Sequence, residues 1–204
     1  MRAERERSSR KPWRSDLAKQ FPRLEPAHRA FIERQHVFFT ATAAATGRIN
    51  LSPKGLDSLR VLADDKVAYL DLTGSGSEAS AHLMADGRMT IMFCAFSGPP
   101  LILRLYGGGT AHRRGSETYR ALLPRFGEEP LGARQIVVLD VDLVQTSCGF
   151  GVPLYAYEAE RPSLARWAES KGEEGSEAYR REKNAVSIDG LPTGFAPDSM
   201  APPQ

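Results

Sequence analysis

The central part of the chain, residues 37–144, alternates short apolar runs with tight turns, and this pattern constrains the fold more than any other feature. Turn sequences such as Thr46-Gly47-Arg48 and Asp64-Asp65-Lys66 separate the runs. Apolar runs rich in aromatic and β-branched residues, bounded by Gly, Pro or Asp, predict strands. Many short strands with short connections favour an antiparallel barrel. The predicted strands cover residues 37–43, 49–54, 67–72, 89–96, 101–106 and 135–144.

Helices are predicted around this block. Pro26 suits the first position of a helix. Ser75 and Glu78 have the spacing of a capping box, and Asp86-Gly87 is a typical C-terminal stop. The predicted fold class is mainly β (α+β), an antiparallel barrel with peripheral helices and a helical C-terminal extension. The predicted helices cover residues 26–35, 76–85, 116–126, 163–171 and 176–185.

The chain of 204 residues is long enough for one domain with a substantial core. Basic residues are concentrated in the first fourteen positions, which predicts a flexible basic arm over residues 1–24. The barrel domain is then expected over residues 25–150. Residues 151–204 are expected to form a helical extension followed by a coil tail. The net charge of +2 gives no indication of a nucleic-acid partner, and none is expected.

Targeting and cysteine signals point to a cytoplasmic protein. No apolar run approaches the ~20 residues that a membrane-spanning helix needs, so no membrane partner is expected. The charged N-terminus lacks the apolar segment of a secretory signal. Cys94 and Cys148 do not form a disulfide framework, and the four histidines lack metal-ligand spacing. No metal site is therefore expected.

Two segments carry polar groups that suit a phosphorylated ligand. Asn50, Ser52 and Lys54 alternate along one predicted strand, so their side chains share a face. The Gly/Ser turn at residues 73–77 leads into a predicted helix, whose free backbone N–H groups favour an anion. Two simpler interpretations remain open: a plain turn, and the solvent-exposed face of a hairpin.

Four segments in this order have a familiar pattern: residues 37–42 (VFFTAT), 47–55 (GRINLSPKG), 69–78 (YLDLTGSGSE) and 92–96 (MFCAF). The chain here resembles the pyridoxamine 5′-phosphate oxidase-like proteins, over about residues 28–150. These are split β-barrels that bind FMN at a dimer interface. The resemblance therefore implies a split barrel, FMN as cofactor, a homodimer with the cofactor at its interface, and a small-molecule substrate.

The resemblance also implies roles for individual residues. Lys54 would pair with the FMN phosphate, while Asn50 and Ser52 would bind the flavin or ribityl chain. The pyridoxamine phosphate oxidases carry a basic pair where this chain has Ser77-Glu78, so Arg104 is a further candidate for the phosphate charge, or else a partner in a structural ion pair. Gln145 and Ser147 share a strand face and are candidates for the flavin edge. The residues implied for the phosphate on the turn are Thr73, Ser75 and Ser77.

Three functions are compatible with these features. The first is an FMN-dependent oxidoreductase acting on a small organic substrate, for which the sequence identifies no catalytic residue. The second is a non-catalytic module that binds flavin or haem. The third is a reductase that uses F420 on the same barrel.

Overall fold

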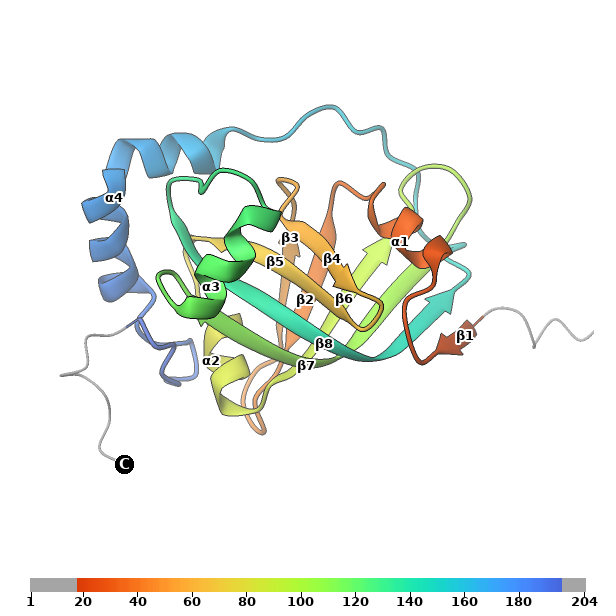
Figure 1. Ribbon diagram of the computed structural model, residues 1–204, viewed down its shortest axis with the longest axis horizontal. Helices are drawn as coiled ribbons and strands as arrows, with labels where there is room; N and C mark the ends of the chain where they lie inside the picture. Colours follow the sequence, from red (N-terminus) through yellow and green to blue (C-terminus); the bar gives the residue numbers. More distant parts are fainter. Residues whose placement is uncertain (1–17, 196–204) are drawn as a thin grey trace, which may run out of the picture.

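The computed structural model describes residues 18–195, which form a curved antiparallel sheet with helices on its outside (Figure 1). The strands are β1 (Ala18–Phe21), β2 (Phe38–Thr42), β3 (Asn50–Lys54), β4 (Leu59–Ala63), β5 (Lys66–Leu72), β6 (Arg88–Cys94), β7 (Ile102–Arg113) and β8 (Ala133–Ser147). The helices are α1 (Pro26–Ile32), α2 (Glu78–Ala85), α3 (Glu117–Leu122), the 3₁₀ helix η1 (Leu123–Arg125) and α4 (Ser163–Lys183).

The strands pair in the order β3-β2-β6-β7-β8-β5-β4, every pair is antiparallel, and β1 adds to β8. The long strands β7 and β8 pair over most of their length, and the shorter strands attach on either side of them. The sheet is curved so strongly that Lys54 Nζ, on the edge strand β3, lies 2.7 Å from Asp71 Oδ1 on β5. The predicted fold class, an antiparallel α+β split barrel with peripheral helices, is confirmed.

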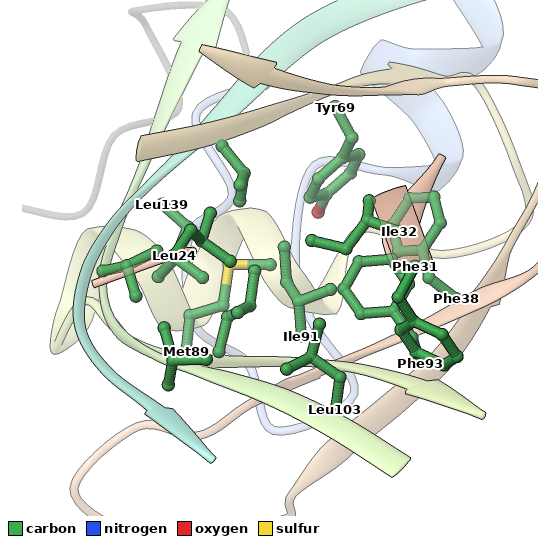
Figure 2. Close-up of a cluster of buried hydrophobic side chains, with 14 of the residues drawn as sticks. Leu24, Phe31, Ile32, Phe38, Tyr69, Met89, Ile91, Phe93, Leu103 and Leu139 are labelled. Carbon is green, nitrogen blue, oxygen red and sulfur yellow. The ribbon is translucent and has the colours of Figure 1, made fainter. Parts of the chain in front are cut away.

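The main hydrophobic core fills the inside of the curved sheet (Figure 2). Ile91 and Leu103 are fully buried there, and Phe38 packs its ring against Tyr69 and Phe93 at centroid distances of 5.8 and 5.9 Å. These inward residues alternate with outward ones, as the period of a strand requires. A second buried cluster covers the outer side of β5 and β8. Its members include Ala68, Leu70, Ile136, Val138 and Tyr119 of α3.

Strand β7 does not end at residue 106, as the sequence predicted, but continues through its three glycines to Arg113. The ladder shifts its register between Tyr106 and Gly107. A Cβ atom on Gly107 would lie 1.9 Å from the carbonyl oxygen of Asp140. Three consecutive glycines allow either a sharp bend or a close backbone approach. The structure has the close approach, which shifts the strand register without ending the strand.

The ends of the fold differ from the predicted boundaries. Residues 18–21 form β1 and Leu24 is buried in the core, so the flexible arm predicted over residues 1–24 extends too far. Its first seventeen residues lie outside the described part of the chain. Strands β1 and β4 were not predicted, because neither Ala-Lys-Gln-Phe nor Leu-Arg-Val-Leu-Ala alternates polar and apolar residues throughout.

The two predicted C-terminal helices, residues 163–171 and 176–185, are the two halves of α4, which are separated by a kink at Gly172. Gly172 has φ 64° and ψ −176°, a conformation that glycine adopts without strain. The segment between β8 and α4 crosses one end of the barrel (Figure 1). Within residues 18–195, no helix is long and apolar enough to cross a membrane.

Candidate functional site

A cavity of about 830 Å³ lies between strand β3 and the turn that leads from β5 into α2. Asn50, Ser52 and Lys54 line it from β3, and Ser75 and Ser77 line it from the turn. Five of the nine residues expected at a cofactor site therefore line one cavity. Such a volume is within the range of about 300–1,000 Å³ that ligand pockets occupy.

The alternation along β3 sets the polar wall of this cavity. Asn50, Ser52 and Lys54 are half-buried, whereas Leu51 and Pro53 point outward and are exposed. The Ser52 hydroxyl donates to Asn50 Oδ1 at 3.0 Å. The strand thus presents an amide, a hydroxyl and an ammonium to the same space, in the arrangement that the sequence predicted.

Lys54 is held by a buried carboxylate that the sequence analysis did not identify as part of the site. Asp71 is 2 % exposed and accepts hydrogen bonds from Lys54 Nζ at 2.7 Å, Arg134 Nε at 2.8 Å and Gln135 Nε2 at 2.8 Å. Burial by itself raises the pKa of Asp71, but the attraction of Arg134 and Lys54 outweighs it and holds the pKa well below its ordinary value. A charged residue inside the apolar strand was the signal that could have identified Asp71.

Arg134 extends this network to the turn. Its Nη1 donates to the carbonyl oxygen of Gly76 and to Asn184 Oδ1, both at 3.0 Å, and Asn184 Nδ2 donates to the Gly74 carbonyl at 3.1 Å. The turn is therefore fixed by side chains from β8 and from the end of α4. A Cβ atom built on Gly74 or Gly76 would meet nothing within 4 Å, so the turn borders open space.

A second arginine, Arg113, lies half-buried beside this network. Its Nη1 donates to Gln135 Oε1 at 2.6 Å. Burial, together with repulsion from Arg134, lowers the pKa of Arg113 to about 10, although the Asp71 carboxylate opposes the shift. The guanidinium groups of Arg113 and Arg134 thus share the field of one buried carboxylate.

Thr73 does not line the cavity. It is 1 % exposed, and its hydroxyl donates to the Gly132 carbonyl at 2.8 Å while accepting from Arg180 Nη1 at 3.1 Å. Thr73 therefore joins the turn to the start of β8 and to α4, and its hydroxyl proton is already donated. The C-terminal extension was predicted as a separate helical element, yet Arg180 and Asn184 make it part of the support for the turn.

The predicted capping box at Ser75 and Glu78 is wrong. Helix α2 begins at Glu78 with Ser77 as its N-cap, and the Ser77 hydroxyl donates to Ser80 Oγ at 2.9 Å. The Glu78 carboxylate accepts from the backbone N–H of Ile188 at 3.1 Å. A tertiary contact therefore takes the place of the local one that the spacing suggested.

Arg104, Gln145 and Ser147 lie on the opposite face of the sheet. Arg104 pairs in register with Gln145, and the neighbouring pair Leu105 and Val144 points into the core. Since successive side chains alternate between faces, Arg104 and Gln145 point outward. Arg104 Nη1 donates to Ser147 Oγ at 3.1 Å, and Tyr106 Oη donates to Gln145 Oε1 at 3.1 Å.

The expected residues on β3 and those on β7 and β8 therefore lie on opposite faces of the sheet. A single chain cannot present both groups to the same ligand. Ser52 pairs with the fully buried Thr40, so the polar wall of β3 belongs to the inner face of the sheet. The Arg104 group belongs to the outer face. In the described part of the chain, no group of three His, Cys, Asp or Glu side chains is arranged to hold a metal ion.

Comparison with known proteins identifies the family. The family model for pyridoxamine 5′-phosphate oxidase matches residues 24–148. The pyridoxamine 5′-phosphate oxidase family protein ustO of Aspergillus flavus is 42% identical over 176 residues, which cover 78% of this chain and 71% of that protein.

Solved structures with a similar fold are more distant in sequence. HutZ, a haem storage protein from Vibrio cholerae, is 19% identical, with a TM-score of 0.45 over 59% of this chain and 93% of HutZ. An FMN-binding protein from Syntrophomonas wolfei is 16% identical, with a TM-score of 0.42 over 57% and 82%. On the evidence of the family model and the Aspergillus relative, this chain belongs to the pyridoxamine 5′-phosphate oxidase family.

Proposed function

We propose that this protein binds FMN in the cavity between β3 and the turn at residues 73–77 and acts as an FMN-dependent oxidoreductase on a small organic substrate. The observation that carries the proposal is the placement of Lys54, Asn50 and Ser52 opposite an open glycine–serine turn, in a chain of this family. FMN is the cofactor that the family resemblance implies.

The groups around the cavity fit the polar parts of FMN. A phosphate needs cations and N–H or O–H donors, and the cavity offers the Lys54 ammonium and the Ser75 hydroxyl beside the start of α2. A ribityl chain and a flavin edge need mixed donors and acceptors, which Asn50 and Ser52 supply. Glu78 lies beside the turn, but its carboxylate is engaged by the N–H of Ile188.

Each residue has a distinct role in this proposal. Lys54 neutralises phosphate charge, and Asp71 and Tyr69 position its ammonium, which lies 2.7 Å from the carboxylate and 5.6 Å from the ring centroid. Asn50 and Ser52 orient the rest of the cofactor. Bound FMN would supply hydride or electron transfer, and the protein would bind it and exclude water.

Lys54→Ala is expected to weaken FMN binding about ten- to hundredfold, because a lost charge-assisted hydrogen bond costs about 1.5–3 kcal/mol. Flavin fluorescence titration measures the dissociation constant. Lys66→Ala is the matched control, since Lys66 pairs with the exposed Asp140 and lies outside the cavity. An unchanged dissociation constant in Lys54→Ala would remove this lysine from the site.

The absorption spectrum of the purified protein separates the three candidate functions. Bands of oxidised flavin support the proposal, and reduction of that flavin by a nicotinamide donor supports an oxidoreductase over a storage module. A Soret band indicates haem. A colourless protein that binds F420 but not FMN indicates the third function.

We further propose that the protein is a homodimer whose cofactor site is completed by the outer sheet face of a second copy. The support is geometric: Arg104, Gln145 and Ser147 face away from the cavity of their own chain, so they can meet its ligand only from another copy. The dimer is also what the family resemblance implies.

Subunit mixing tests the shared site. Lys54→Ala and Arg104→Ala should each bind FMN weakly as homodimers. In a mixed dimer, one site carries both changes and the other carries neither, so roughly a quarter of all sites should recover tight binding after equal mixing. If the mixture binds no better than its components, the two residues do not act on one ligand from different subunits. A monomer by sedimentation that still binds FMN tightly would also contradict the dimer.

A further inference from the structure

A chain of hydrogen bonds connects the buried His82 to the polar wall of the cavity. His82 lies on α2, is 2 % exposed and does not line the cavity. Its Nδ1 lies 3.1 Å from the hydroxyl of Thr42, which is also buried. Thr42 Oγ1 accepts from Asn50 Nδ2 at 3.2 Å, and Asn50 Oδ1 accepts from Ser52 Oγ at 3.0 Å.

The positions of the protons in this chain follow from the orientation of the Asn50 amide, whose Nδ2 faces Thr42 and whose Oδ1 faces Ser52. The Thr42 hydroxyl already accepts from Asn50 and has one proton to donate. His82 Nδ1 is the partner at hydrogen-bond distance for that proton. A buried hydroxyl proton without an acceptor is costly, so Nδ1 accepts, and the imidazole carries its proton on Nε2.

The opposite tautomer would reverse the whole chain. With a proton on Nδ1, Thr42 would accept from His82 and donate to Asn50. The Asn50 amide would then turn over, with its oxygen toward Thr42 and its NH₂ group toward Ser52. The Ser52 hydroxyl would accept from that amide and direct its own proton into the cavity. The imidazole therefore determines whether Ser52 is a donor or an acceptor toward a ligand.

We infer that His82 is a positioning residue: through Thr42 and Asn50 it makes the Ser52 oxygen a hydrogen-bond acceptor toward the cavity. The ligand atom opposite Ser52 is then an N–H or O–H donor. This inference rests on the proposed function for the identity of the ligand. In FMN, the groups of this class are the imide N–H of the flavin ring and the ribityl hydroxyls.

Two substitutions at His82 distinguish this role from simple space filling. His82→Asn keeps an acceptor, because Asn Oδ1 is bonded to Cγ as His Nδ1 is. His82→Leu keeps apolar volume and removes the acceptor. His82→Leu is expected to weaken FMN binding about three- to tenfold while His82→Asn stays close to the wild-type protein. Retained affinity in His82→Leu, with loss in His82→Asn, would overturn the inference.

Thr42→Val tests the same chain at its next link. It removes the hydroxyl with little change of shape, and it should weaken FMN binding as much as His82→Leu does. The double variant should be no weaker than either single variant, because both changes break one chain. Fully additive losses would show that the two residues act separately.

Nitrogen chemical shifts of the His82 imidazole provide a readout that needs no cofactor. In the cofactor-free protein at neutral pH, nitrogen-15 NMR should show an unprotonated Nδ1 and a protonated Nε2. A protonated Nδ1 overturns the inference, whatever FMN does. A wild-type protein that binds no FMN overturns the proposed cofactor instead, and the imidazole shifts still decide the direction of the chain.

Discussion

Asp71→Asn is expected to lower the free energy of unfolding by about 3–5 kcal/mol, because it leaves the buried guanidinium of Arg134 without its counter-ion. The wild-type carboxylate accepts from Arg134, Lys54 and Gln135 at 2.7–2.8 Å. The amide keeps the shape of the carboxylate but carries no charge. Urea unfolding followed by circular dichroism measures the loss.

Asp140→Asn is the matched control on the same pair of strands. Asp140 pairs with Lys66 across β5 and β8, but both side chains are largely exposed, at 62% and 44%. Exposed ion pairs contribute about 0–1 kcal/mol, so the control should change stability little. Equal losses in the two variants would mean that burial of Asp71 does not determine its contribution.

The loss in Asp71→Asn should also depend on pH. The pKa of Asp71 is lowered in the folded protein, so its carboxylate stabilises the fold fully above its ordinary value of 3.8. Below that value, the unfolded chain takes up a proton that the folded protein still excludes, and the contribution declines. The difference in unfolding free energy between wild type and Asp71→Asn should therefore be larger at pH 7 than at pH 3.

Gly107→Ala is expected to lower the melting temperature by more than about 8 °C, or to prevent folding altogether. Its Cβ would lie 1.9 Å from the carbonyl oxygen of Asp140. A main-chain atom inside a paired strand cannot move away as a flexible side chain can. Relief of the clash would require β7 and β8 to separate where they hold the barrel together.

Gly108→Ala is the neighbouring control. A Cβ there would meet nothing within 4 Å, and alanine restricts the unfolded chain more than glycine does. Its unfolding free energy should change by no more than about 1 kcal/mol. Thermal unfolding of the two variants side by side measures the difference. Similar melting temperatures would show that β7 and β8 approach less closely than the structure indicates.

Most strands of the barrel could be predicted from the sequence, because each depends on neighbours within a few positions. The turn at residues 46–48 separates two predicted strands, and these form β2 and β3. The alternation of Asn50, Ser52 and Lys54 follows from the two-residue period of a strand alone.

Predictions from local spacing were wrong where a segment distant in the sequence supplies the hydrogen-bond partner. Ser75 and Glu78 have capping-box spacing, but Glu78 accepts from Ile188, which is 110 positions away in the chain. The C-terminal extension supports the turn through Arg180 and Asn184. Spacing within one segment carries no information about which remote groups will satisfy its polar atoms.

The composition of the site was decided by the tertiary structure. The sequence marks Asp71 as a charge in an apolar strand, but only the pairing of β5 with β8 brings Arg134 to it, and only the curl of the sheet brings Lys54. Likewise, Arg104 and Ser52 look equally suited to a cofactor in the sequence, yet the strand register places them on opposite faces. Periodicity determines which side chains of one strand share a face, whereas pairing with other strands determines which of those faces points inward.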